Sequence, residues 1–297
     1  MACVPFLGES PSGADVRPPI EQLVDLHSDT ARRDLFYGPG GRASAHSDAP
    51  YRFLAREEKG VSTNFEVEDA RGRRWNAKFG EEVKPEVAAS RLLWAIGFHQ
   101  PPVYYVRNWQ IANGPEAGAQ PEARFRLEDG WNKHGEWKWQ DNPFTGTREM
   151  QGLVVMMAML NNWDLKTSNN KIYETPGTPS ERRYVVKDLG DSFGHSARIF
   201  LGTLNDTEDF AREPFIRRVK HDRVDLYFRP LLLNWGVDRD IAVDDVLWTC
   251  QRLARLRDRQ WRDAFRAAGY SEEEGAPFID RMRAKVKEGL ALEGAQT

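Results

Sequence analysis

Two short polar segments constrain this chain more than any other feature of its sequence. The first covers residues 161–170 (Asn-Asn-Trp-Asp-Leu-Lys-Thr-Ser-Asn-Asn) and follows the apolar run 153–160. The second covers residues 184–190 (Tyr-Val-Val-Lys-Asp-Leu-Gly) and follows a strand-like run. An Asp with an Asn five residues later, then a second Asp before an apolar residue and Gly, is a layout typical of phosphoryl transfer. A fold that uses both segments must bring the two loops together.

Each polar residue of these segments has a chemical task in such a reaction. Phosphoryl transfer needs Mg²⁺ on the phosphates, a cation near the γ-phosphate and a carboxylate that orients the attacking hydroxyl. Asp164 would orient the hydroxyl, and Lys166 would lie on the γ-phosphate side. Asn169 and Asp188 would hold Mg²⁺, because hard cations take oxygen ligands. Gly190 would permit the sharp turn after the second Asp.

The order Asp-Leu-Lys-x-x-Asn at 164–169, followed by Asp-Leu-Gly at 188–190, resembles the catalytic and metal-binding loops of the protein-kinase-like superfamily. The phrases at 78–82 and 162–166 are similar to bacterial proteins related to HipA-type and phosphatidylinositol-kinase-like enzymes. The resemblance implies a two-lobed α+β fold, the use of ATP and Mg²⁺, and transfer to a hydroxyl of a protein, lipid or small molecule. Asn-Asn-Trp at 161–163 replaces the usual His-Arg, which argues against an ordinary eukaryotic-type protein kinase.

The resemblance also implies a strand lysine that contacts the phosphates and a helix glutamate that holds this lysine in place. The segment 73–80 alternates as a strand does, and Lys78 is its best candidate. The segment 85–97 begins with Pro and ends with Gly, as a helix does, and Glu86 is its only acid. Both residues also have simpler interpretations: a first-turn acid favoured by the helix dipole, and a solvated strand lysine.

A loop that covers the phosphates is expected between the strands 51–56 and 64–69. It contains Gly60, Ser62 and Thr63, which supply one glycine and two hydroxyls in place of a full Gly-x-Gly-x-x-Gly. A single Gly between strands is also typical of an ordinary hairpin turn.

The expected architecture is α+β, with a small antiparallel-sheet lobe that has one helix and a larger, mainly helical lobe. We divide the chain into a flexible tail (1–20), an N-terminal extension (21–50), the sheet lobe (51–145) and the helical lobe (146–297). A further strand pair is predicted at 102–109 and 123–127. Residues 222–294 are predicted to be helical, with helices at 243–257, 259–268 and 277–289.

Composition excludes several other classes of protein. A net charge near −3 gives no general attraction for nucleic acid or anionic membranes. Two cysteines cannot form a disulfide framework, and no apolar run approaches the roughly 18 residues of a membrane span. The need for ATP favours the cytoplasm. The start Met1-Ala2-Cys3, before a stretch rich in Pro, Gly and Ser, is also compatible with a trimmed lipoprotein or secreted form.

Three alternatives stay open at this point. Turns rich in Asn, Asp and Ser often serve only as turns, and Asn161 and Asn162 then cap the preceding helix. A pseudokinase would keep the fold and bind a nucleotide or a partner without turnover. An α+β interaction protein would carry the motifs by coincidence, and Lys78 and Asp188 would then lie far apart.

Overall fold

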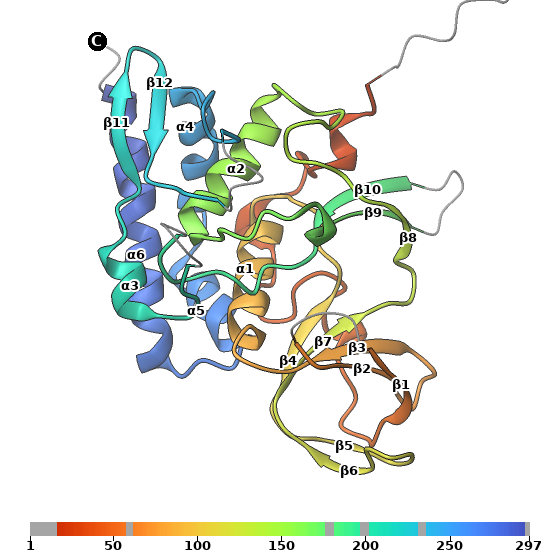
Figure 1. Cartoon of the computed structure of the whole chain (residues 1–297). Helices are drawn as coiled ribbons and strands as arrows, with labels where there is room; N and C mark the ends of the chain where they lie inside the picture. The colour runs from red at the N-terminus through yellow and green to blue at the C-terminus, as the bar shows by residue number, and fades with distance from the viewer. Residues whose placement is uncertain (1–16, 58–61, 176–180, 197–201, 231–235, 295–297) are drawn as a thin grey trace, which may run out of the picture.

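The computed structural model describes residues 17–57, 62–175, 181–196, 202–230 and 236–294 (Figure 1). Its strands are β1 (Arg52–Glu57), β2 (Asn64–Glu68), β3 (Arg74–Lys78), β4 (Val103–Val106), β5 (Trp109–Ile111), β6 (Gly118–Gln120), β7 (Ala123–Leu127), β8 (Asn132–Gly135), β9 (Asn170–Thr175), β10 (Glu181–Val186), β11 (Ile216–Lys220) and β12 (Arg223–Leu226). Its α-helices are α1 (Val83–Ala95), α2 (Arg148–Leu160), α3 (Thr207–Arg212), α4 (Val243–Ala254), α5 (Asp258–Arg266) and α6 (Glu272–Leu290). The α+β architecture expected from the sequence is therefore present.

One antiparallel sheet of five strands, in the order β1-β2-β3-β7-β4, forms the sheet lobe together with α1. Side chains alternate between the two faces of a strand. The apolar positions of β2, β3 and β7 therefore fall on one face, where Phe65, Val67, Trp75, Ala77 and Phe125 form a core of their own. The hairpin of β5 and β6 contributes to this core through its buried residues. The opposite face carries the polar positions, including Lys78, and looks toward the rest of the molecule.

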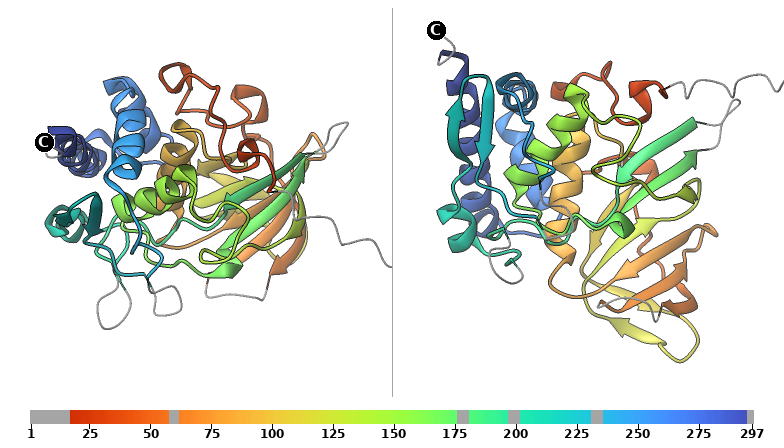
Figure 2. Two further views of the ribbon diagram at one scale, coloured as in Figure 1. Left: turned by 90° about the horizontal axis from the view of Figure 1, so that it is seen from above. Right: turned by 45° about the horizontal axis from the view of Figure 1, so that its top comes forward.

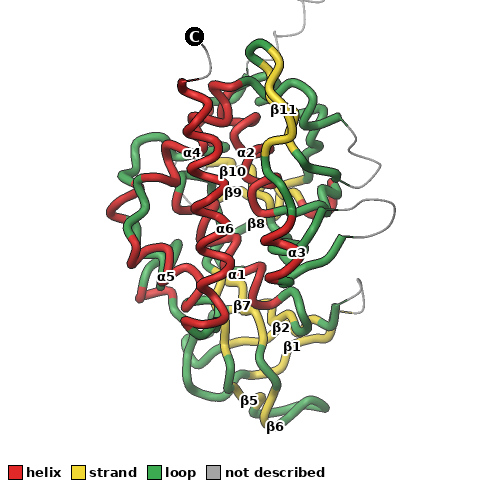
Figure 3. Tube along the Cα trace, turned by 90° about the vertical axis from the view of Figure 1, so that its left-hand side faces the viewer, coloured by secondary structure: helices red, strands yellow, loops and turns green. Residues whose placement is uncertain are grey.

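Helix α1 connects the sheet to the remaining helices (Figure 3). It has Pro85 in its first turn, where a missing N–H costs nothing, and Gly97 follows its end with a φ of +114°. Most of its residues are buried, because the helix contacts β4 and β7 on one side and α5 on the other. A helix enclosed in this way holds its side chains at fixed positions.

Helices α2, α4, α5 and α6 gather on one side of the molecule, together with the β11–β12 hairpin, and the five-stranded sheet lies on the other (Figure 2). These helices form the helical region around the larger core, which includes Met150 and every residue of α2 from Leu153 to Leu160. The sequence predicts that the last helix starts at Pro277, and this is wrong. It starts at Glu272, because Ser271 and Glu274 form a capping box at 3.1 and 2.8 Å.

Smaller sheets complete the fold. Strands β8, β9 and β10 form one antiparallel sheet, and β11 and β12 form a hairpin. Strand β12 lies inside the range 222–294 that the sequence analysis predicts as helical, so that prediction is wrong for its first residues. Within the described ranges, no helix combines the length and the apolar character that a membrane crossing requires.

Candidate active site

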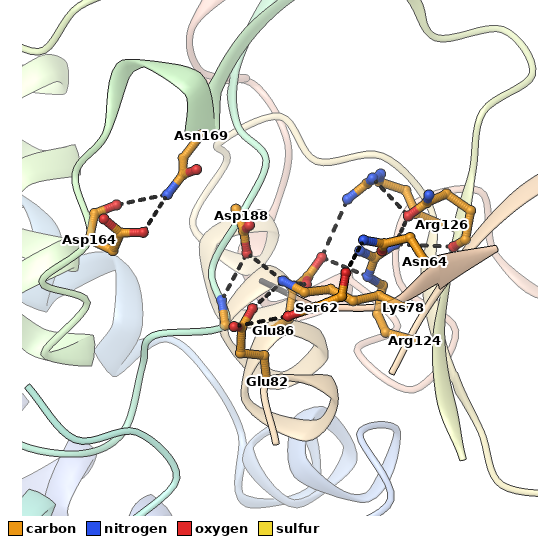
Figure 4. A network of polar contacts seen from close by, with 12 residues as sticks. Ser62, Asn64, Lys78, Glu82, Glu86, Arg124, Arg126, Asp164, Asn169 and Asp188 are labelled. Atoms are coloured by element: carbon orange, nitrogen blue, oxygen red, sulfur yellow. Dashed lines mark hydrogen bonds and ion pairs between the residues drawn. The ribbon is translucent and has the colours of Figure 1, made fainter. Parts of the chain in front are cut away.

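Lys78 is the last residue of β3, and its ammonium group is the centre of a cluster of acids (Figure 4). Its Nζ donates to Asp188 Oδ1 at 3.0 Å and to Glu86 Oε2 at 3.3 Å. It also forms an ion pair with Glu82. The Lys78 side chain is 5% exposed. The structure thus joins the end of a strand, the first turn of α1 and the loop after β10, although 110 residues separate Lys78 from Asp188.

The charges of this cluster stabilise one another. Burial alone would lower the pKa of Lys78, but Glu86 and Asp188 outweigh it and hold the pKa above its ordinary value. Burial alone would likewise raise the pKa of Asp188, but Lys78 outweighs it and lowers the pKa to about 2. The lysine is therefore a cation and the aspartate an anion across the physiological range of pH.

Glu86 contacts two further cations that come from β7. Its Oε1 lies 2.8 Å from Arg124 Nε and 3.4 Å from Arg126 Nη1. Both arginines are buried, and Glu86 itself is 1% exposed. A carboxylate buried among three cations is held firmly in place, because the loss of its position would leave several charges unpaired.

Asp164 is the centre of a second cluster, in the loop that follows α2. Its Oδ2 accepts from Lys166 Nζ at 2.9 Å and from Asn169 Nδ2 at 3.1 Å. Asn169 Nδ2 also donates to the Asp164 carbonyl at 2.9 Å. The Asn side chain therefore uses its nitrogen to fix the carboxylate, and its amide oxygen is the atom left for a cation. Figure 4 places this cluster on one side of Asp188 and Lys78 on the other.

Backbone and amide contacts tie the Asp164 loop to the segment around Asp188. The Lys187 N–H donates to the Asn169 carbonyl at 2.7 Å. Asn161 ends α2 in the left-handed conformation, and its Nδ2 donates to the Gly194 carbonyl at 2.6 Å. Asn162 Nδ2 donates to Ser192 Oγ at 3.0 Å. The two asparagines that replace His-Arg thus cap the helix and also hold the two loops together.

Gly190 serves a different purpose from the one the sequence suggests. Its φ is not positive, so the turn does not require glycine for its backbone conformation. A Cβ at this position would lie 2.5 Å from the Cβ of Glu82. Glycine is needed here because the loop after Asp188 approaches Glu82 closely, and that approach holds Glu82 beside Lys78.

The three residues predicted for the phosphate-covering loop differ in their relation to the Lys78 cluster. Ser62 Oγ donates to Glu82 Oε1 at 3.3 Å and so joins the Lys78 cluster. Thr63 is exposed, and its carbonyl accepts from the Phe79 N–H at 3.1 Å. Gly60 lies outside the described residues. The structure therefore brings one of the two hydroxyls to the cluster.

The oxygen ligands suited to a hard cation gather at one place. Carboxylate oxygens of Glu82, Glu86 and Asp188 lie within 4.8 Å of one another. Asp191, three residues further along, is close to Glu82, Asp164 and Asp188. Burial and these three carboxylates raise the pKa of Asp191 to about 7. Acidic groups that repel one another in this way are a setting in which a divalent cation relieves the repulsion.

Sequence reasoning missed four members of the site: Glu82, Arg124, Arg126 and Asp191. Strand alternation in Ala-Arg-Phe-Arg-Leu at 123–127 places both arginines on one face, opposite the buried Phe125. That signal could have identified them as partners for Glu86. Glu82 and Asp191 have no comparable signal, because each comes to the site through the path of a loop.

The comparisons with known proteins concern the fold. A scan against protein-family models finds no match, and no curated protein matches the chain in sequence. Among solved structures, the chain is similar to the Helicobacter pylori proinflammatory kinase CtkA, with a TM-score of 0.52 and 9% sequence identity. The match covers 83% of this chain and 97% of that chain. The fold of this protein is therefore kinase-like, with an antiparallel-sheet lobe and a helical region.

Proposed function

We propose that this protein is a phosphotransferase that moves the γ-phosphoryl group of a nucleoside triphosphate to a hydroxyl acceptor with the help of Mg²⁺. ATP is the donor that the resemblance implies. One observation carries the proposal: in a kinase-like fold, Lys78 Nζ lies 3.3 Å from Glu86 and 3.0 Å from Asp188. A large separation between Lys78 and Asp188 would have favoured the alternative of coincidental motifs, whereas the two side chains lie 3.0 Å apart.

The residues present fit a magnesium ion. Asp188 supplies a carboxylate that stays ionised, and Asn169 supplies an amide oxygen, so the ligand set consists of oxygen atoms. A carboxylate oxygen of Glu82 lies within 4.8 Å of one of Asp188, so both could bind one ion. When bound, Mg²⁺ neutralises charge on the phosphate oxygens. These residues would hold the ion between the Lys78 cluster and the Asp164 loop.

The chain's own residues then account for the transfer step. Lys78 binds phosphate oxygens of the donor, and Glu86 fixes the direction of its ammonium group. Asp164 accepts the proton of the acceptor hydroxyl as the hydroxyl oxygen forms its bond to the γ-phosphorus. The bond from that phosphorus to the β–γ bridging oxygen breaks, and the nucleoside diphosphate leaves. Lys166, 2.9 Å from Asp164, offsets negative charge on the phosphoryl group during transfer.

Two measurements on the wild-type protein test the proposal. A nucleotide with MgCl₂ should raise the melting temperature, because a ligand that binds only the folded state stabilises it. Incubation with labelled ATP, or GTP, should produce labelled protein or labelled acceptor. Binding without any transfer would identify a pseudokinase, and the absence of binding by every nucleotide would overturn the proposal.

Substitutions of Asp188 and Asp164 should affect nucleotide binding and phosphoryl transfer differently. Asp188→Asn should weaken Mg²⁺-dependent nucleotide binding more than Asp164→Asn does, because the first removes a charged metal ligand. Asp164→Ala should lower transfer by about 10²-fold or more. The same variant should change the free energy of unfolding by about 1 kcal/mol or less, because no apolar cavity forms. Equal losses of binding in the two Asn variants would contradict these assignments.

A further inference from the structure

Strand β11 is the outer strand of the β11–β12 hairpin, and one of its edges is open. It pairs antiparallel with β12, and no other strand of the described chain joins this two-stranded sheet. Residues 217–220 of β11 are all exposed. Figure 3 shows β11 on the face turned toward the viewer, and Figure 1 shows it on the opposite side of the helical region from β3, the strand that ends with Lys78. A surface at this edge is therefore separate from the Lys78 cluster.

The backbone of Val219 points toward the open edge. In an antiparallel pair, two opposite residues either bond to each other through both backbone groups or turn these groups away from each other. Val219 is opposite Val224, and the Val224 N–H donates to the Ile241 carbonyl at 2.9 Å, beyond the other edge of β12. The pair is therefore of the second kind. The Val219 N–H and C=O point away from β12, and neither has a hydrogen-bond partner among the residues that the structure describes.

The charges of β11 are all positive. Arg217, Arg218 and Lys220 are the charged residues of the strand. Arg218 forms an ion pair with Asp225 at 3.4 Å, and its side chain is 69% exposed. Within the described ranges, Arg217 and Lys220 have no ion pair and no side-chain hydrogen bond. A second copy of β11 would bring like charges together, which disfavours pairing of this strand with itself. An acidic strand would meet cations that have no partner to give up.

The cations of β11 border a cavity of about 620 Å³. Two residues of β11 and their cross-strand partners share one face of the hairpin and line this cavity: Arg218, Lys220, Arg223 and Asp225. The lining has four Arg and Lys residues and three Asp residues, and two of these aspartates already pair with arginines, at 3.4 and 3.8 Å. Val219 lies on the other face and is 37% exposed. A strand added along β11 would therefore place every second side chain beside the cations and the others beside Val219.

We propose that the open edge of β11 binds an extended peptide segment of a partner protein, with acidic side chains at alternate positions and apolar side chains between them. Two hydrogen bonds to the Val219 backbone would fix the added strand, as in other complexes formed by addition of a strand to a sheet edge. Arg218 and Lys220 would attract the acidic side chains. A nucleic acid would use the cations but would leave the Val219 backbone groups to water, so the open backbone favours a peptide. The proposal does not depend on the proposed function.

Fluorescence anisotropy with labelled peptides tests the proposal on the full chain. A peptide of repeated Glu-Val units supplies the charges, the apolar side chains and the backbone N–H groups that the edge requires. The residue that bonds to Val219 lies on the same face as Val219, so it is one of the apolar positions. A Glu-Pro repeat of equal length keeps the charge and removes the N–H at those positions. We expect the Glu-Val peptide to bind about fivefold more tightly than the Glu-Pro peptide, the range of one net hydrogen bond.

Val219→Pro removes the corresponding N–H from the protein. That N–H takes no part in the pairing with β12, and proline occurs at edge positions of this kind. We expect the variant to bind the Glu-Val and Glu-Pro peptides equally. Melting temperatures check that the variant is folded, and the Glu-Pro peptide tests the same bond on the wild-type protein if it is not.

The double variant Arg217→Gln with Lys220→Gln tests the charges. It should weaken binding of the Glu-Val peptide by about three- to tenfold, the range of two exposed ion pairs. Lys138→Gln with Arg255→Gln is the matched control, because it removes the same charge at two exposed positions outside β11 and should leave the affinity unchanged. An equal loss of affinity in the two double variants would mean that the net charge of the protein attracts the peptide, and it would overturn the assignment to β11.

The other outcomes decide what kind of surface this edge is. Equal affinities of the wild type for the Glu-Val and Glu-Pro peptides would identify a patch that attracts charge without strand pairing, and they would overturn the proposal. So would the absence of binding by the Glu-Val peptide. A labelled oligo-dT that binds more tightly than the Glu-Val peptide, and that loses affinity in the β11 double variant, would assign the cations to nucleic acid instead. Each of these results leaves the phosphotransferase proposal standing, because β11 belongs neither to the Lys78 cluster nor to the Asp164 loop.

Discussion

Two buried lysines, one in each half of the molecule, have opposite electrostatic surroundings. Lys78 in the sheet lobe contacts three carboxylates, and its pKa is raised. Lys285 on α6 is fully buried and donates to the Met159 carbonyl and to Asn161 Oδ1, both at 2.8 Å. Burial lowers the pKa of Lys285 well below its ordinary value, and Arg281 adds to the effect.

If the proposed function holds, the difference is one between a lysine that binds a ligand and a lysine that only caps a helix. Lys285 satisfies the last carbonyls of α2 and the left-handed Asn161, which begins the Asp164 loop. Its partners are dipoles, so its task is complete without a ligand. The groups in contact with Lys78 are carboxylates, and carboxylates that gather at one lysine repel one another. Under the proposed function, a divalent cation bound by these carboxylates and a phosphate bound by Lys78 would relieve that repulsion.

Lys78→Met should produce the largest effect, because it removes the cation on which the cluster depends. We expect transfer to fall by about 10²-fold or more, as for other groups that stabilise the charge of a transition state. The pKa of Asp188 should rise, since Lys78 is the main charge that lowers it. Turnover measurements with Mg²⁺ provide the test, and Lys138→Met, an exposed lysine, is the control. A Lys78→Met protein with more than half of wild-type turnover would remove Lys78 from the mechanism.

Lys285→Met should affect stability more than chemistry. Loss of the donor leaves buried carbonyls unsatisfied and should lower the free energy of unfolding by about 1–3 kcal/mol. Urea unfolding of both proteins measures this difference. Lys287→Met, at an exposed position on the same helix, is the matched control.

The pH dependence of that difference follows from the lowered pKa of Lys285. Between this pKa and the ordinary value of 10.5, the unfolded chain binds a proton that the folded chain does not. Stability of the wild type therefore rises with pH across this window relative to the Met variant, which lacks the group. The difference in the free energy of unfolding between the wild type and Lys285→Met should be larger at pH 9 than at pH 7. A difference that stays the same between pH 7 and pH 9 would show that Lys285 is charged in the fold.

The sequence predicts the framework of the fold because periodicity reports local structure. The strand predicted at 51–56 is observed at 52–57, and the helix predicted at 243–257 is observed at 243–254. Alternation and helical spacing depend on which face is buried, and the core enforces that pattern. The division at residues 145 and 146 and the HipA-type relationship stay predictions.

The interior of the site was harder to predict for a physical reason. Strand alternation shows that Arg124 and Arg126 share a face, but polar residues in a strand usually face water, so the sequence does not show that this face is buried. They are buried because α1 and Glu86 cover that face, which is a matter of tertiary packing. Glu82 reaches Lys78 only because Gly190 leaves space for it. Sequence motifs were enough to select Lys78, Glu86, Asp164 and Asp188 as candidates. The residues that hold these side chains in place were identified only in the structure.

Glu82→Gln should give the smallest effect and the sharpest test of the Lys78 cluster. In the protein without ligand, the Glu82 carboxylate pairs with the ammonium group that phosphate must reach. Loss of its charge should therefore strengthen nucleotide binding in EDTA by about two- to fivefold, the range of one partly exposed ion pair. With MgCl₂ present, the sign should reverse if the same carboxylate ligates the cation, because a charged ligand is lost.

Glu81→Gln is the matched control for this variant, because Glu81 is the exposed neighbour and takes no part in the cluster. The ratio of the affinity in MgCl₂ to the affinity in EDTA is the quantity that decides. A ratio below the wild-type value would indicate that Glu82 pairs with Lys78 when no ligand is bound and binds the cation when nucleotide and metal are present. The Glu82 carboxylate would then exchange one partner for the other on binding. An affinity in EDTA equal to that of the wild type would mean that Glu82 does not compete with phosphate, and Lys78 would then be held for the nucleotide by Glu86 and Asp188 alone.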